Sequence, residues 1–91
     1  MSLTTLNKSQ PFHINKHAEA FMLITTAPGE EKKVLQKLMK FDALTEAHAV
    51  NGSYDILAKF RTENYERLKG LLKMRIKKIE GVKRTRVLLV V

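Results

Sequence analysis

The sequence contains no cysteine, so disulfides, thiolate nucleophiles and zinc sites built on thiolates are all excluded. A chain of 91 residues makes room for one small domain. Domains of this size commonly gain stability from disulfides, from a metal ion or from a partner chain. With the first source excluded and metal ligands scarce, we expect association with other chains to provide the additional stability.

Long hydrophobic runs are also missing from the sequence. The longest apolar stretch, residues 87–91, is far too short to cross a bilayer. Residues 1–18 are polar and lack the pattern of a signal peptide, so we interpret them as a flexible tail in front of one domain at residues 19–91. We therefore expect a soluble, cytoplasmic protein that has no membrane partner.

The common signatures of catalysis are absent as well. The sequence has no Walker lysine loop, no G-x-G-x-x-G run and no G-x-S-x-G elbow. His13 and His17 share helical spacing but lack carboxylate partners, so no metal site is expected. His48 lies two residues from Glu46 on a predicted strand, which allows an acid–base pair, although a partly exposed strand histidine is the simpler interpretation. We expect no catalytic residue, metal or cofactor; a small dimeric α+β barrel enzyme stays open as the second alternative.

The first half of the domain predicts a strand, a helix and a hairpin. Residues 20–25 are apolar and partly β-branched, as in a buried strand. Pro28-Gly29 and two glutamates then open a helix whose apolar face is Val34, Leu35, Leu38 and Met39. Residues 44–50 alternate, with Leu44, Glu46, His48 and Val50 on one face, and residues 54–61 return as a strand. Between them Asn51-Gly52 predicts a tight hairpin, because both residues tolerate positive φ.

The second half predicts another helix and a final strand. Thr62 is the expected N-cap, and Gly81 fits the position just past the helix end. Residues 82–91 have the composition of a last strand. The apolar stripe between them steps by three or four residues and consists of Tyr65, Leu68, Leu72, Ile76 and Ile79.

The order strand, helix, strand, strand, helix, strand predicts a ferredoxin-like α+β fold, with both helices on one face of a four-stranded antiparallel sheet. The first and last strands, however, are apolar on both faces, whereas a sheet with one wetted face alternates apolar with polar residues. We therefore expect a homodimer formed through the sheets, a dimeric α+β barrel. A monomer whose residues 1–18 lie across the sheet is the alternative.

Positive charge is concentrated toward the C-terminal half. The net charge is +8, and ten of the seventeen basic residues lie in residues 61–86. A basic face on the second helix, formed by Lys69, Lys73, Lys77 and Lys78, has the spacing to follow phosphates, so a nucleic-acid-binding module is the first alternative function. A solvated helix face is the more usual meaning of such spacing.

The hairpin region combines a turn, an aromatic hydroxyl and a carboxylate within residues 51–55. Backbone N–H groups of a turn can bind a carboxylate, and Asp55 can bind an ammonium group. Both charged ends of an amino acid could be met in this way. A purely structural hairpin with a surface aspartate fits the residues equally well.

Two runs of the sequence, residues 50–57 (VNGSYDIL) and residues 79–87 (IEGVKRTRV), resemble the effector-binding (RAM) domain of Lrp/AsnC regulators. The hallmarks of that family are a T-G-x-Y-D-like hairpin, an I-x-G-V run and a threonine in the last strand. Pro28-Gly29 with Val34 and Leu38 also match. The resemblance covers residues 19–91.

This resemblance implies a domain that dimerises through its sheets, that assembles into rings of eight in many relatives, and that binds amino acids or related small effectors between dimers. Full-length relatives carry an N-terminal helix-turn-helix domain, which residues 1–18 cannot supply. The implied function is a stand-alone sensing module that acts through self-assembly or through a full-length Lrp/AsnC partner, without direct specific DNA binding. The residues that would line its ligand pocket are Asn51, at the usual threonine position, Gly52, Tyr54, Asp55 and Thr85.

One departure from the family concerns the last strand. Arg84 and Arg86 make this strand more basic than it is in many relatives. We expect these two arginines to alter the ligand preference or to favour an acidic partner.

Overall fold

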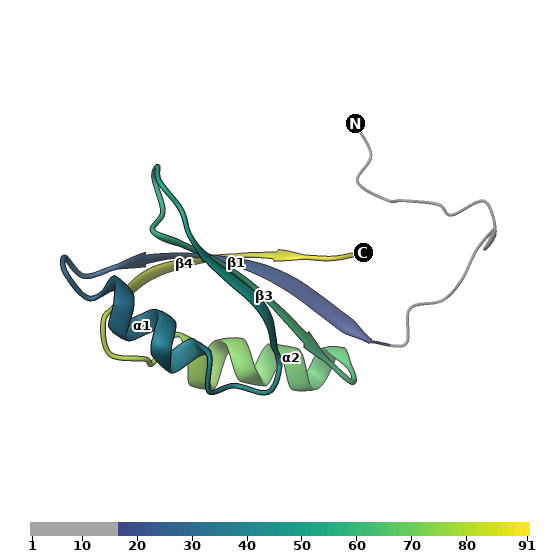
Figure 1. Cartoon of the computed structure of the whole chain (residues 1–91). Coiled ribbons are helices and arrows are strands. Elements are labelled where there is room, and N and C mark those ends of the chain that lie inside the picture. Colours follow the sequence, from purple (N-terminus) through teal and green to yellow (C-terminus); the bar gives the residue numbers. More distant parts are fainter. Residues whose placement is uncertain (1–16) are drawn as a thin grey trace.

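The computed structural model describes residues 17–91, so His13 and nearly all of the expected tail lie outside the described residues. Four antiparallel strands form one sheet in the order β2-β3-β1-β4, and both helices lie on one face of it (Figure 1). The predicted ferredoxin-like βαββαβ fold is confirmed. The elements in chain order are β1 (Ala18–Thr26), α1 (Glu31–Leu38), β2 (Leu44–Ala49), β3 (Ile56–Thr62), α2 (Tyr65–Leu71), its π-helical continuation η1 (Leu72–Ile76) and β4 (Val82–Leu89).

The core lies between the helices and the sheet, and it follows the predicted periodicities closely. Alternate residues of the two central strands, β1 and β3, point at the helices and are fully buried. The helices contribute residues spaced by three or four. Met39 and Tyr65 belong to the predicted apolar faces but are 73% and 49% exposed, because they lie at the helix ends. The buried apolar residues are Ala20, Met22, Ile24, Val34, Leu38, Ile56, Ala58, Phe60, Leu68, Leu72 and Ile76.

The prediction of a tight turn at Asn51-Gly52 is wrong. The N–H of Val50 donates to the carbonyl of Asp55 at 2.9 Å, which leaves the four residues 51–54 in the loop. Gly52 has a φ of 152° and no non-glycine residue within residues 17–91 has a positive φ, whereas the expected turn needs positive φ at both central residues. The reason is that Asp55 is held by β1, where its N–H donates to the carbonyl of Ile24 at 2.9 Å.

The prediction that Leu44 shares a face with Glu46 and His48 is also wrong. Leu44 pairs with Phe60, but Glu46 pairs with Lys59, so the register shifts between them. This irregularity places Leu44 on the helix side and turns Glu46 and His48 to the opposite face of the sheet.

The second helix begins later than expected. Thr62 still belongs to β3, and Asn64 is the N-cap, with its side-chain oxygen accepting from the N–H of Arg67 at 2.9 Å. The helix also widens at its end, where the N–H of Lys77 donates to the carbonyl of Leu72, five residues back, at 3.3 Å. No helix within residues 17–91 is long and apolar enough to cross a membrane.

The sheet face opposite the helices carries an apolar patch that we call the open face, formed by Phe21, Leu23, Leu57 and Leu88. In the strand register Phe21 lies opposite Leu88, and Leu23 lies opposite Leu57. Leu88 is 48% exposed and the other three are half-buried. No element of residues 17–91 covers this face (Figure 1). The expectation of apolar residues on both faces is confirmed for Phe21 and Leu23 of β1. In β4 it holds for Leu88, whereas Arg84 and Arg86 make the first half of that strand basic on this face.

Candidate functional site

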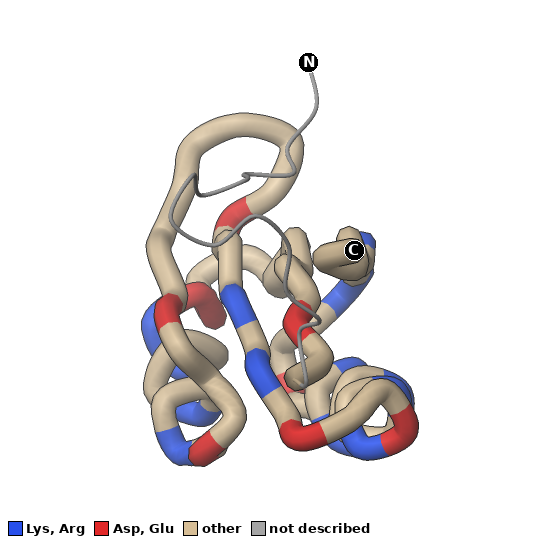
Figure 2. Tube along the Cα trace, turned by 90° about the vertical axis from the view of Figure 1, so that its right-hand side faces the viewer, with Lys and Arg blue, Asp and Glu red and all other residues tan. Residues whose placement is uncertain are grey.

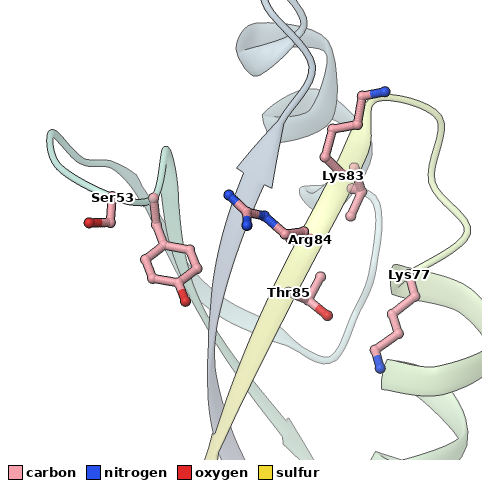
Figure 3. Close-up of a pocket in the computed structure, with 7 residues that line it drawn as sticks. Ser53, Lys77, Lys83, Arg84 and Thr85 are labelled. Carbon is pink, nitrogen blue, oxygen red and sulfur yellow. The ribbon is translucent and has the colours of Figure 1, made fainter.

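A hollow of about 610 Å³ lies where the β2–β3 loop approaches the beginning of β4. Its volume falls within the range of small-molecule sites, which is about 300–1,000 Å³. Figure 3 shows residues from the loop, from the C-terminal end of η1 and from β4 around the hollow. The lining residues are Ser53, Tyr54, Lys77, Val82, Lys83, Arg84 and Thr85.

Asp55 fixes the position of the loop. Its carboxylate oxygen Oδ2 accepts hydrogen bonds from the N–H of Thr26 at 2.8 Å and from the Thr26 hydroxyl at 3.2 Å. Thr26 ends β1, which lies between β3 and β4 in the sheet. These two bonds, together with the bond from the Asp55 N–H to Ile24, therefore hold the base of the loop at the end of β1, beside the first residues of β4.

The structure brings two of the five predicted site residues together. Tyr54 and Thr85 both line the hollow, although thirty-one positions separate them in the sequence. Asn51 and Gly52 are exposed on the same loop but do not line it. Asp55 lies just beneath the loop, with its carboxylate engaged by Thr26.

Sequence reasoning did not select the remaining lining residues as site residues. The sequence singles out Arg84 for its charge in the last strand and Lys77 as part of the basic helix face. Neither observation connected them to the hairpin, because that contact depends on β4 lying at the edge of the sheet beside β1. The available signal was Gly81, whose position marks where the chain turns from the helix into β4.

Arg84 and Thr85 reach the hollow from opposite sides of β4. Neighbouring side chains of a strand point to opposite faces, and in the register Arg84 lies opposite Thr25 whereas Thr85 lies opposite the buried Ile24. In Figure 3 Arg84 points toward the side of the loop that carries Ser53, whereas Lys77 approaches from the helical side. The lining residues therefore lie on both sides of β4, which is an edge strand.

The Glu46–His48 pair forms, but away from the hollow. His48 Nε2 lies 2.8 Å from Glu46 Oε1, and both side chains are about half exposed on the face opposite the helices. An enzyme with its polar cluster between helices and sheet would need them on the other face. Among residues 17–91, no group of three histidine or acidic side chains is arranged to hold a metal ion.

The basic helix face borders a second, smaller hollow of about 250 Å³ between the helical segment and β4. Lys69, Lys73 and Lys77 line it together with apolar residues from α2, η1 and β4, whereas Lys78 does not. Lys and Arg positions also occur on α1 and on the strands (Figure 2). Positive charge is thus distributed over several surfaces.

Comparison with curated proteins identifies regulators as relatives. FL11 from Pyrococcus furiosus, an HTH-type transcriptional regulator, is 38% identical over 71 residues, which cover 78% of this chain and 46% of that protein. FL11 from Pyrococcus abyssi is 35% identical over the same shares of both chains. This chain therefore spans about half the length of these relatives.

Solved structures and the family model agree with that result. The crystal structure of FFRP-DM1 superposes with a TM-score of 0.80 at 30% identity, covering 81% of this chain and 99% of that chain. AsnC from E. coli superposes with a TM-score of 0.76 at 27% identity, covering 81% of this chain and 50% of that chain. Residues 19–91 match the model of the Lrp/AsnC ligand binding domain, and the chain belongs to that family.

Proposed function

We propose that this chain is a sensing and oligomerisation module of transcription regulation, which binds a small effector in the hollow beside Tyr54 and Thr85. The observation that carries the proposal is a juxtaposition. The two runs that resemble the family, residues 50–57 and 79–87, are far apart in sequence, yet residues of both line the same hollow. The module acts in the cytoplasm and has no catalytic activity of its own.

The open face supports pairing of two copies. Phe21, Leu23 and Leu88 form an uncovered apolar surface at the middle of the sheet, and a two-fold dimer buries the same surface on both partners. Dimers then join into larger rings, or mix with a full-length Lrp/AsnC regulator. A ligand regulates this assembly only if its affinity differs between the assembly states.

The hollow supports binding of an amino acid or related metabolite where two dimers meet. Tyr54 and Thr85 contact the ligand directly. Asn51 and Gly52, exposed on the same loop, contact it when a second dimer closes over the loop. Asp55 contributes by holding the loop on β1, in addition to any contact of its own with the ligand.

Calorimetry with the twenty amino acids and related organic acids, combined with light scattering, tests this function. We expect heat of binding from at least one compound and a change in particle size when it binds. Tyr54→Phe removes a hydroxyl from the hollow and should weaken binding, whereas Tyr65→Phe makes the same change on α2 and should not. Absence of binding to every compound, with no change in size, would contradict the proposal.

The nucleic-acid alternative depends on the row of Lys69, Lys73 and Lys77. It predicts binding of duplex or single-stranded DNA that weakens steeply as salt increases. Titration of labelled DNA at two salt concentrations separates the two functions. Tight, salt-dependent DNA binding without any effector response would favour the alternative.

A further inference from the structure

The lining of the 610 Å³ hollow is rich in hydrogen-bond donors. Six of its seven residues carry a donor in the side chain: three hydroxyls from Ser53, Tyr54 and Thr85, and three cations from Lys77, Lys83 and Arg84. The seventh residue, Val82, is apolar, and no lining residue carries a carboxylate. Such a lining matches a ligand that is mainly an acceptor.

The three cations have no carboxylate counterpart within the described residues. The ion pairs found in residues 17–91 use Lys33, His48 and Lys59, each with a glutamate elsewhere in the fold. Three like charges around one hollow repel each other, and an anion bound between them offsets that repulsion. The hollow is thus electrostatically suited to a negative ligand.

Asp55 and Glu80, the acidic residues next to the lining residues in the sequence, do not change this balance. Asp55 lies under the loop, and its Oδ2 already accepts two hydrogen bonds from Thr26. Glu80 precedes β4 but does not line the hollow. The ammonium group of a neutral amino acid would therefore meet cations and hydroxyls in this lining, and no carboxylate.

Two of the three cations lie on opposite sides of β4, while the Lys83 side chain extends away from Ser53 and Thr85 (Figure 3). Arg84 points toward the loop, on the side where Ser53 lies, and Lys77 approaches from the helical side, where Thr85 lies (Figure 3). Because lining residues lie on both sides of this edge strand, a ligand with two separated negative groups has a cation to pair with on each side.

We propose that the hollow selects a small dianion whose two negative groups are separated, such as a dicarboxylate, and that an ammonium group is not required. This inference rests on the proposed function, since it names the ligand class of the same hollow. Arg84 with Ser53 binds one negative group, and Lys77 with Thr85 binds the other.

Calorimetry on the full chain with four probes tests the inference: 2-oxoglutarate, glutamate, glutamine and inorganic phosphate. We expect 2-oxoglutarate and glutamate to bind at least about tenfold more tightly than glutamine, and 2-oxoglutarate to bind at least as tightly as glutamate. Phosphate, a compact dianion, should bind more weakly than both. Affinity should fall as salt increases.

The possible results separate this inference from the proposed function. If glutamine or another neutral amino acid binds as tightly as the dicarboxylates, the ligand class is wrong but the sensing function stands. If phosphate binds as tightly as 2-oxoglutarate, the need for separated charges is wrong. If neither these probes nor any of the twenty amino acids binds, both proposals fail.

Matched variants locate the binding. Arg84→Gln and Lys77→Gln should each weaken 2-oxoglutarate binding about tenfold, because each removes one charged contact. Lys73→Gln makes the same change one helical turn from Lys77, outside the hollow, and should leave the affinity unchanged. All three side chains are exposed, so circular dichroism should show an unchanged fold. An equal loss of affinity in Lys73→Gln would mean that the ligand is attracted by the overall positive charge. That result would overturn the assignment of the site to this hollow.

Discussion

Gly81 lies where the chain turns from the helical segment into β4, and its backbone has a φ of +99°. A Cβ at this position would lie 3.0 Å from Val34 Cγ2 and 3.2 Å from Glu30 Cβ. Both the conformation and the close approach to α1 therefore favour glycine. The sequence identified the turn from this glycine, but the contact with α1 depends on how the helix packs beside it.

Gly81→Ala should lower the free energy of unfolding by about 1–3 kcal/mol, through backbone strain and the clash with Val34. Gly70 provides the matched control. It lies inside α2, where an added methyl group would meet no atom within 4 Å beyond its own helix backbone, so Gly70→Ala should raise the free energy of unfolding by about 0.5–1 kcal/mol. Urea denaturation at one protein concentration measures both. A neutral Gly81→Ala would contradict this account of the turn.

Asp55 shows how a residue can be selected from the sequence while one of its structural contacts cannot be. The hairpin motif selected it as a binding carboxylate, but its partner Thr26 is 29 positions away, and only the pairing of β1 with β3 brings them together. Thr26 is 9% exposed, so loss of Asp55 leaves a nearly buried N–H without its acceptor.

We expect Asp55→Ala to destabilise the fold by about 1–3 kcal/mol, which is the usual cost of leaving a buried donor unsatisfied. Asp42→Ala, at an exposed position between α1 and β2, should change stability by less than about 0.5 kcal/mol. Thermal unfolding of both variants compares them directly. If Asp55→Ala were as stable as Asp42→Ala, the contact between Asp55 and Thr26 would not be what holds the loop.

At the level of elements, local patterns predicted the helices and strands because their apolar residues recur at the period of each structure. The bulge near Leu44, the four-residue hairpin loop and the start of α2 were not predictable in the same way. Each depends on pairing with a distant strand: β3 sets the register of Leu44, β1 fixes Asp55, and the pairing of β3 extends through Thr62. For the same reason, the sequence suggested Tyr54 and Thr85 but not Lys77 as a neighbour.

The start of α2 gives a test at this scale. Asn64→Ala removes the side-chain acceptor for the N–H of Arg67 and should destabilise the protein by about 1 kcal/mol. Asn51→Ala makes the same change in the exposed loop and should have little effect on stability. Comparing the two by urea denaturation assigns the cap, and an unaffected Asn64→Ala would contradict it.

For the whole molecule, the proposed assembly depends on the two-sided apolar character of β1. The two helices cover one side of the sheet, while Phe21, Leu23, Leu57 and Leu88 stay on the other. Arg84 and Arg86 lie on this same side of β4, nearer the hollow. Pairing through the open face would therefore place the basic end of β4 at the border of the interface, next to the proposed ligand site.

Leu88→Lys should prevent pairing, because it would bury a charge in an apolar interface at a cost of several kcal/mol. Leu88 is 48% exposed in the single chain, so the fold of each copy should survive. Met39→Lys, at a position that is 73% exposed at the end of α1, makes the same change away from the open face and should leave assembly unaffected.

Sedimentation equilibrium of the unmodified chain at micromolar concentration, beside these two variants, tests association through the open face most directly. We expect the unmodified chain and Met39→Lys to have a molar mass of twice the 10.4 kDa chain mass or a larger even multiple of it, and Leu88→Lys to sediment at 10.4 kDa. A folded, unmodified chain that sediments at 10.4 kDa would contradict the account.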